Sequence, residues 1–301
     1  LARAGDDTAA TALTRVTGLS VVNSKFVYVR GLGERYSSAL LNGSPLPSPE
    51  PLQRVVPLDL FPSSILGGIS VQKTYSPEFP GEFGGGVIQL STVAVPRDPF
   101  VTLGFSLGYN SETTWEDALT YYGGDTDNLG VDDGTRKLPN PVRDGILTGL
   151  RIGEANFDSA TLQVMGRSFE NASINLIQEE NAPLNGGVDF SAGRSFDLGF
   201  GDFGFVTVLG YDNSWTTRDQ VQQLGIATPT GLEVQEDFET FTTQQDVLWN
   251  ALLGFGLEMG DHEFKWTNLY VRATSKEARI SEGESTVSSG PVRDDNTAWY
   301  Q

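Results

Sequence analysis

After residue 96 the chain alternates between apolar and polar side chains with a period of two. In 100–110 the residues Val101, Leu103, Phe105, Leu107 and Tyr109 alternate with small or polar ones. The same pattern marks 188–200, 203–215 and 246–258, and more weakly 263–274. Because successive side chains of a strand point to opposite faces, the pattern predicts five antiparallel strands that each have one apolar face.

The connections between these strands differ in length. The expected turns at 201–202 and 259–262 are very short, whereas the expected loops at 111–187, 216–240 and 275–301 are long. Short turns at one end and long loops at the other are typical of an outer-membrane β-barrel. Strands of about ten residues are also long enough to cross a bilayer at a tilt.

The first 92 residues follow a different pattern, that of a small mixed domain. A helix is expected over 6–18, because Ala9, Ala12, Leu13 and Val16 have helical spacing, Asp6 or Asp7 can cap it and Gly18 suits the position after it. Strands are expected at 19–22, 26–30, 69–73 and 87–90, and a proline-rich loop at 43–53.

Glycines mark the turns of this domain. Gly84, Gly85 and Gly86 stand together between two expected strands, where the missing Cβ lets a neighbouring backbone approach closely. Gly31 and Gly43 are expected to be structural in the same way. We expect these glycines to shape the turns and not to contact a ligand.

Three stretches carry a resemblance to a known family. They are VYVRGLGERY at 27–36, LLNGSPL at 40–46 and VQKTYSPEFPGEFGGGVIQLST at 71–92. In this order they resemble the plug domain of TonB-dependent outer-membrane receptors. The resemblance implies an α+β plug domain at 1–96, followed at 97–301 by antiparallel strands and extracellular loops of an outer-membrane β-barrel. Since such barrels have about 22 strands, we expect an incomplete barrel, a piece of a longer protein.

The resemblance also implies a function. Members of this family are active transporters of scarce ligands such as siderophores, metal complexes, cobalamin or carbohydrates, and they lie in the outer membrane of Gram-negative bacteria. The implied partners are TonB, through a segment preceding Leu1, the transported ligand and the lipid around the barrel. No cofactor, no resident metal and no enzymatic activity are expected.

Matching the family position by position suggests two groups of functional residues. Arg30 and Lys73 fall where basic residues hold the plug to the barrel wall until TonB acts. Two loops correspond to the parts of the plug that face the ligand, and their expected contact residues are Arg35, Tyr36, Ser37, Pro47, Ser48 and Glu50.

Composition excludes several other functions. A net charge of −19 disfavours nucleic acid as a partner, and the absence of cysteine together with a single histidine, His262, rules out thiolate catalysis and a histidine cluster. Asp125, Asp127 and Gly130 begin like a calcium loop, but Arg136 stands where the bidentate glutamate belongs. We therefore expect a solvated acidic loop there, with weak binding of divalent cations left open.

Two alternatives remain open from the sequence. The chain could be an acidic all-β surface protein for binding or adhesion, which would expose no continuous apolar belt. A cleft with two convergent carboxylates would instead indicate an enzyme.

Aromatic residues near the expected strand ends suit a girdle at the membrane interface or ordinary packing. They are Phe200, Phe203, Trp215, Trp249, Phe264 and Trp266.

Overall fold

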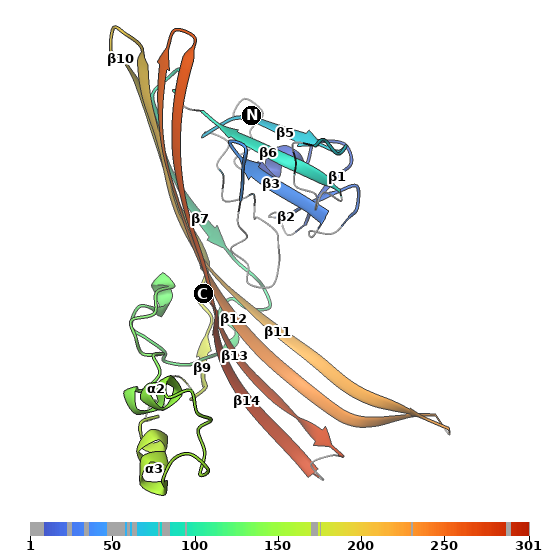
Figure 1. The fold of residues 1–301 in the computed structure, drawn as a ribbon. Coiled ribbons are helices and arrows are strands. Elements are labelled where there is room, and N and C mark those ends of the chain that lie inside the picture. The colour runs from blue at the N-terminus through green and yellow to red at the C-terminus, as the bar shows by residue number, and fades with distance from the viewer. Residues whose placement is uncertain are drawn as a thin grey trace.

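The computed structural model describes residues 9–22, 26–32, 36–46, 58, 61, 65–77, 79, 85–93, 95–169, 174, 176–229, 231–286 and 290–300. A mixed N-terminal domain packs beside a long, twisted antiparallel sheet (Figure 1). The expected fold class, α+β followed by all-β, is confirmed.

The N-terminal domain contains one short helix and two small sheets. Helix α1 (Ala9–Leu13) precedes a hairpin of β1 (Leu19–Val22) and β2 (Phe26–Val29). A mixed sheet has the order β4-β3-β6-β5, in which β3 is parallel to β6; its strands are β3 (Ser37–Leu41), β4 (Ser44–Pro45), β5 (Leu66–Gln72) and β6 (Gly86–Thr92). The four expected strands are thus confirmed.

The helix ends earlier than the sequence predicts. The N–H of Val16 donates to the oxygen of Leu13 at 3.0 Å, a three-residue spacing that closes a turn and not a further α-helical bond. Gly18 does adopt a positive φ of 77°, but it lies in the turn that leads into β1 and not directly after the helix. Residues 6–8, with the expected capping aspartates, lie outside the described residues.

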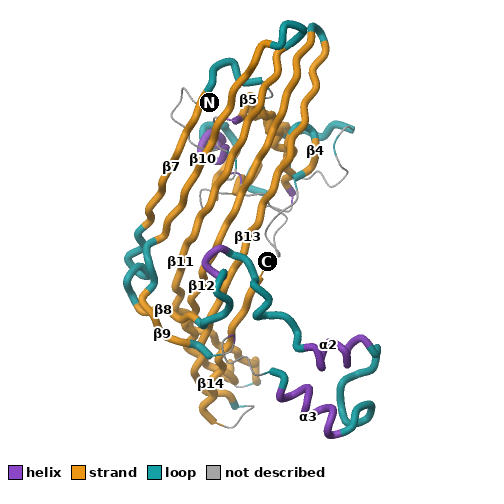
Figure 2. The backbone as a smooth tube through the Cα atoms, turned by 90° about the vertical axis from the view of Figure 1, so that its left-hand side faces the viewer, coloured by secondary structure: helices purple, strands orange, loops and turns teal. Residues whose placement is uncertain are grey.

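The large sheet is a meander in which each strand pairs with the next. Its order is β14-β13-β12-β11-β10-β7, so β7 and β14 are the edges of an open sheet within the described residues (Figure 2). The strands are β7 (Phe100–Gly108), β10 (Asn185–Asp197), β11 (Asp202–Thr228), β12 (Gly231–Met259), β13 (His262–Ser285) and β14 (Gly290–Tyr300).

Two of the three expected long loops are wrong. Residues 216–240 continue β11 and β12 as paired strands, and residues 275–301 contain the end of β13 and all of β14. The described sheet therefore has six strands, not five, and its central strands are about twice as long as expected. These extensions are mostly polar. Their few apolar residues, such as Val221, Leu224 and Ile226, do not form the sustained alternation by which a strand is recognised.

The third long connection is present and carries its own structure. Its described residues contain a two-stranded ribbon, a 3₁₀ turn and two α-helices: β8 (Asp117–Thr120), η5 (Asp127–Leu129), α2 (Asn140–Leu147), α3 (Ser159–Arg167) and β9 (Gln178–Asn181). We call residues 111–184 the inserted segment. In the described part of the chain, no helix has the length and apolar character needed to cross a membrane.

The two faces of the sheet have different neighbours. The N-terminal domain packs on one face, where Val206, Val208 and Leu252 join the same hydrophobic core as Leu13 and Leu90. The inserted segment lies on the opposite face (Figure 1). We call the first the inner face and the second the outer face.

The outer face near the short turns is apolar, and it is uncovered except at the row of Tyr211 and Trp249. The side chains of these two residues donate hydrogen bonds to the oxygens of Asn128 and Leu129 in the inserted segment. Its side chains form rows across the strands, one of which joins Phe105, Val188, Tyr211 and Trp249. Phe105 is 74% exposed, and Leu198 and Leu209 are also exposed. These side chains therefore do not form a closed interior, and the prediction that the alternating strands have an exposed apolar face is confirmed.

Candidate functional site

The N-terminal domain is tied to the inner face by polar contacts at one turn. Asn42 and Gly43 connect β3 to β4 with φ values of 50° and 84°, the geometry of a tight hairpin turn. The Asn42 amide nitrogen donates to Thr92 Oγ1 at 2.9 Å and to Thr267 Oγ1 of β13 at 3.1 Å. Lys265 Nζ of the same strand reaches the Thr92 oxygen at 3.5 Å. Sequence reasoning singled out Gly43 but missed Asn42, Thr92, Lys265 and Thr267, although Asn-Gly is a recognised hairpin signal.

Arg30 and Lys73, the expected basic pair, both contact the turn before β1. The N–H of Arg30 donates to the oxygen of Gly18 at 2.9 Å, and Lys73 Nζ donates to the oxygen of Thr17. Arg30 has a positive φ of 57° and lies one residue beyond β2, with its side chain exposed. The strand expected at 26–30 therefore ends at Val29, one residue before Arg30. Its proposed role in holding the plug stays a prediction.

The expected ligand-facing residues are only partly described. Tyr36 is exposed and Ser37 begins β3 half-buried. Arg35, Pro47, Ser48 and Glu50 lie outside the described residues. The ligand-contact role of all six stays a prediction.

The glycine turn allows a close approach between strands. A Cβ on Gly86 would lie 2.8 Å from Val29 Cγ1 and 3.0 Å from the Gln72 oxygen. The N–H of Gly85 donates to the Tyr36 oxygen at 2.6 Å. Gly31 has a positive φ with open space around it, and Gly84 lies outside the described residues. Gly86 is thus where β6 passes too close to β2 for any side chain.

Comparison with known families identifies this domain. Residues 1–87 match the family described as "TonB-dependent Receptor Plug Domain". The N-terminal part of this chain is a TonB-dependent receptor plug domain. In the structure the plug sheet continues a few residues further, to the end of β6 at Thr92.

Other comparisons add little beyond this match. One solved structure, the ferric citrate transporter FecA in its unliganded form, is similar to this chain at 10% sequence identity and a TM-score of 0.29. The alignment covers 98% of this chain and 57% of that structure, so this chain spans little more than half its length. No curated protein matches the chain.

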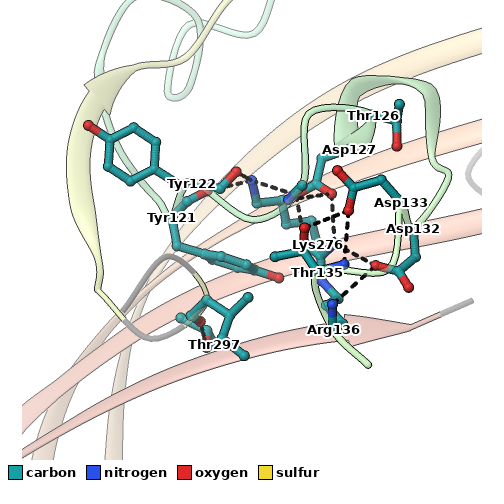
Figure 3. Close-up of polar contacts among 12 residues, drawn as sticks. Tyr121, Tyr122, Thr126, Asp127, Asp132, Asp133, Thr135, Arg136, Lys276 and Thr297 are labelled. Carbon is teal, nitrogen blue, oxygen red and sulfur yellow. Dashed lines mark hydrogen bonds and ion pairs between the residues drawn. The ribbon is translucent and has the colours of Figure 1, made fainter. Parts of the chain in front are cut away.

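A second polar cluster lies on the outer face, across the sheet from the plug. Asp127 of η5 accepts two hydrogen bonds from Arg136, from Nη1 at 2.7 Å and from Nη2 at 2.6 Å (Figure 3). Lys276 of β13 lies 3.1 Å from the same carboxylate. The three side chains are only 5%, 13% and 10% exposed. The expectation of a solvated acidic loop is therefore wrong at Asp127, because two buried cations neutralise it.

Aromatic rings complete this ion cluster. The Arg136 guanidinium lies 3.8 Å from the centroid of the Trp299 ring, and Lys276 Nζ lies 4.4 Å from that of Tyr121. The Tyr121 hydroxyl donates to the Ala298 oxygen at 3.0 Å. The inserted segment is thereby fastened to β13 and β14 by groups far apart in the sequence.

The pKa directions follow from burial and from the partners. Burial alone would raise the pKa of Asp127, but hydrogen bonds from Arg136 and Lys276 outweigh it and bring the pKa below its usual value. For Lys276, burial dominates and lowers the pKa despite the attraction of Asp127, with the positive charge of Arg136 adding to the decrease. Burial raises the pKa of the Tyr121 phenol. Asp127 is thus held mainly by its two hydrogen bonds from Arg136, because the burial of Lys276 offsets more of the attraction between Lys276 and Asp127.

These residues do not make a metal centre. Among the described residues, no group of three or more histidine, cysteine, aspartate or glutamate side chains could hold a metal ion. The place of the bidentate glutamate is taken by Arg136, whose charge opposes a cation. The cluster therefore fastens the inserted segment to the sheet.

Proposed function

We propose that this chain is part of a TonB-dependent active transporter that takes up a scarce ligand across the outer membrane of a Gram-negative bacterium. One observation carries the proposal. A plug domain packs on the inner face of an antiparallel sheet whose outer face exposes rows of apolar side chains. An acidic surface module for adhesion would have no reason to expose such a face.

The apolar rows have the dimensions of a lipid-facing band. They run from the row of Phe203 and Phe264 to the row of Tyr211 and Trp249. From Phe203 to Tyr211 the strand has nine residues, which matches the roughly 9–11 residues with which a tilted strand crosses a bilayer. Leu209 and Leu253 lie between the two ends. We propose that this band contacts the acyl chains of the membrane.

Aromatic rings gather at the two ends of this band. At one end Phe255 stacks on Phe203 and on Trp266, with ring centroids 6.1 and 5.4 Å apart. At the other end Tyr211 and Trp249 lie 4.8 Å apart. This arrangement supports the girdle interpretation for most of the expected aromatics. Trp215 is the exception, because it lies four residues beyond Tyr211.

Transport by this chain is proposed to be gated passage. Ligand would bind the plug loops on the inner side, and TonB would then remodel the plug to open a path. The residues proposed to hold the plug in place are Arg30 and Lys73, as the family resemblance suggests. The ligand is one of a siderophore, a metal complex, cobalamin or a carbohydrate, as the family resemblance suggests.

Uptake by cells tests the transporter proposal directly. A strain lacking the gene should lose growth on one scarce iron chelate, cobalamin or glycan supplied as the sole source. The intact gene should restore growth only when TonB and the proton-motive force are present. Restoration without TonB, or unchanged growth on every such source, would contradict the proposal.

The role of Arg30 needs a separate measurement. Arg30→Ala in the intact receptor should reduce energised uptake more than ligand binding. Arg97→Ala is the matched control, since Arg97 is an exposed arginine between the plug and β7. An equal loss of uptake and binding in Arg30→Ala would indicate a folding defect and remove the proposed role.

A further inference from the structure

A polar cavity lies between the inserted segment and the outer face of the sheet. Its volume is about 410 Å³, and its walls come from β8, β9, η5 and strands β11 to β13. Trp215, Gln245 and Lys276 form the part of the wall that belongs to the large sheet. They lie four residues, about 14 Å of strand, beyond the row of Tyr211 and Trp249. The cavity is therefore on the side of the wall away from the plug and outside the apolar band.

The walls present groups that bind hydroxyls. Gln178 and Glu180 are two residues apart on β9, so both face the cavity, and Asn128, Asn181 and Gln245 add amide groups. The Asn181 amide nitrogen donates to the Trp115 oxygen at 2.9 Å, which leaves its side-chain oxygen as an acceptor. The half-buried indole of Trp215 supplies an aromatic surface. A cavity of this size that combines an aromatic surface with a few convergent polar groups is the usual form of a small-molecule site.

The charges in the cavity select against anions. Lys276 is already engaged by Asp127 at 3.1 Å and by the Tyr121 oxygen at 2.6 Å. Glu180 is close enough to Lys276 to attract it, yet within the described residues its carboxylate makes no ion pair or hydrogen bond. The cavity thus offers an unengaged carboxylate and a cation that is already neutralised. A neutral ligand that donates hydrogen bonds fits this arrangement better than a phosphate or a carboxylate does.

We propose that this cavity binds a sugar ring. Hydroxyl groups of the ring would donate to Glu180 and exchange hydrogen bonds with the amides, which both donate and accept. The C–H face of the ring would pack on Trp215 as other apolar surfaces pack on indole. The ring belongs either to a glycolipid of the surrounding outer leaflet or to a free oligosaccharide. This site is separate from the transport path, because the sheet stands between it and the plug.

Binding is measured on the intact receptor in detergent, purified free of glycolipid. One arm uses free glucose, galactose, mannose and N-acetylglucosamine in saturation-transfer NMR. The other uses vesicles with and without lipopolysaccharide, at equal lipid concentration. Contacts from a sugar ring in the first arm indicate a free saccharide, whereas binding only to lipopolysaccharide vesicles indicates the glycolipid.

Amino-acid substitutions test whether the sugar binds in this cavity. Glu180→Gln and Trp215→Leu should each weaken binding about tenfold or more, as expected for the loss of a charged hydrogen bond or of an aromatic contact. Glu179→Gln is the matched control, because it makes the same change on the other face of the same strand; it should bind as the native protein does. Absence of binding in both arms would overturn the proposal, as would equal affinities of Glu180→Gln and Glu179→Gln.

Discussion

Replacing Asp127 by asparagine tests whether the ion cluster fastens the inserted segment. The change removes the only carboxylate that contacts both Arg136 and Lys276 among the described residues, and leaves two buried cations. Removing one partner of a buried ion pair costs about 3–5 kcal/mol. Asp132 still reaches Arg136 at 3.5 Å, so the lower end of that range applies. A cost of about 3 kcal/mol corresponds to an increase of about a hundredfold in the equilibrium constant for release of the segment.

Hydrogen exchange of the intact receptor measures this release. Amides of residues 112–136 should exchange about a hundredfold faster in Asp127→Asn, while amides of β11 and β12 near the short turns should be unchanged. Asp132→Asn is the matched control, because Asp132 is more exposed and its two contacts with Arg136, at 3.4 and 3.5 Å, are longer than those of Asp127. If the two variants exchange at the same rate, the cluster does not hold the segment and the argument from burial is wrong.

Three further predictions test other parts of the structure. The pKa of Asp127 is lowered in the folded state. The ionised carboxylate therefore contributes to stability above its ordinary pKa of 3.8, and this contribution is lost as the pH falls through the lowered pKa. Protease cleavage of the inserted segment should increase below about pH 4, and Asp127→Asn should remove that increase. Gly86→Ala should destabilise the plug by about 1–3 kcal/mol through overpacking against Val29, whereas Gly68→Ala, which has open space around it, should change the denaturation midpoint little. Leu253→Arg should reduce the stability of the protein in vesicles by about 2–4 kcal/mol if the residue faces lipid. The same change at Leu232, far beyond the band, should cost less than about 1 kcal/mol. Equal effects of the two changes would contradict the assignment of the lipid-facing band.

The sequence predicts a strand correctly where one face of the strand packs on the plug and the other face is the apolar outer face of the sheet. Val206 and Val208 contact the plug core, while Phe205 and Leu209 point to the outer face, so alternation is strong there. Beyond Trp215 most side chains on both faces of the strands are polar. Their stability comes from pairing with neighbouring strands, which leaves no periodic signal in the sequence. This is why 216–240 was expected to be a loop.

The ion cluster shows a different limit. The sequence shows Arg136 at the position where a calcium loop requires a glutamate. Arg136 is only nine residues from Asp127, so an ion pair between the two is compatible with the sequence. Lys276 lies far along the chain, and only the pairing of β12 with β13 brings it to the outer face beside η5. The register of long strands decides such contacts, and composition does not reveal it. The contact of Asn42 with Thr267 was missed for the same reason.

The inserted segment and the plug occupy opposite sides of one wall (Figure 1). A segment placed there cannot serve as a lid over the side where the plug sits. The bend between α2 and α3 offers a practical use of this arrangement, since a Cβ built on Gly149 or Gly153 would meet no atom within 4 Å. An epitope or fluorophore grafted at Gly153 should therefore report on the protein at the surface of living cells without obstructing anything that moves on the other side.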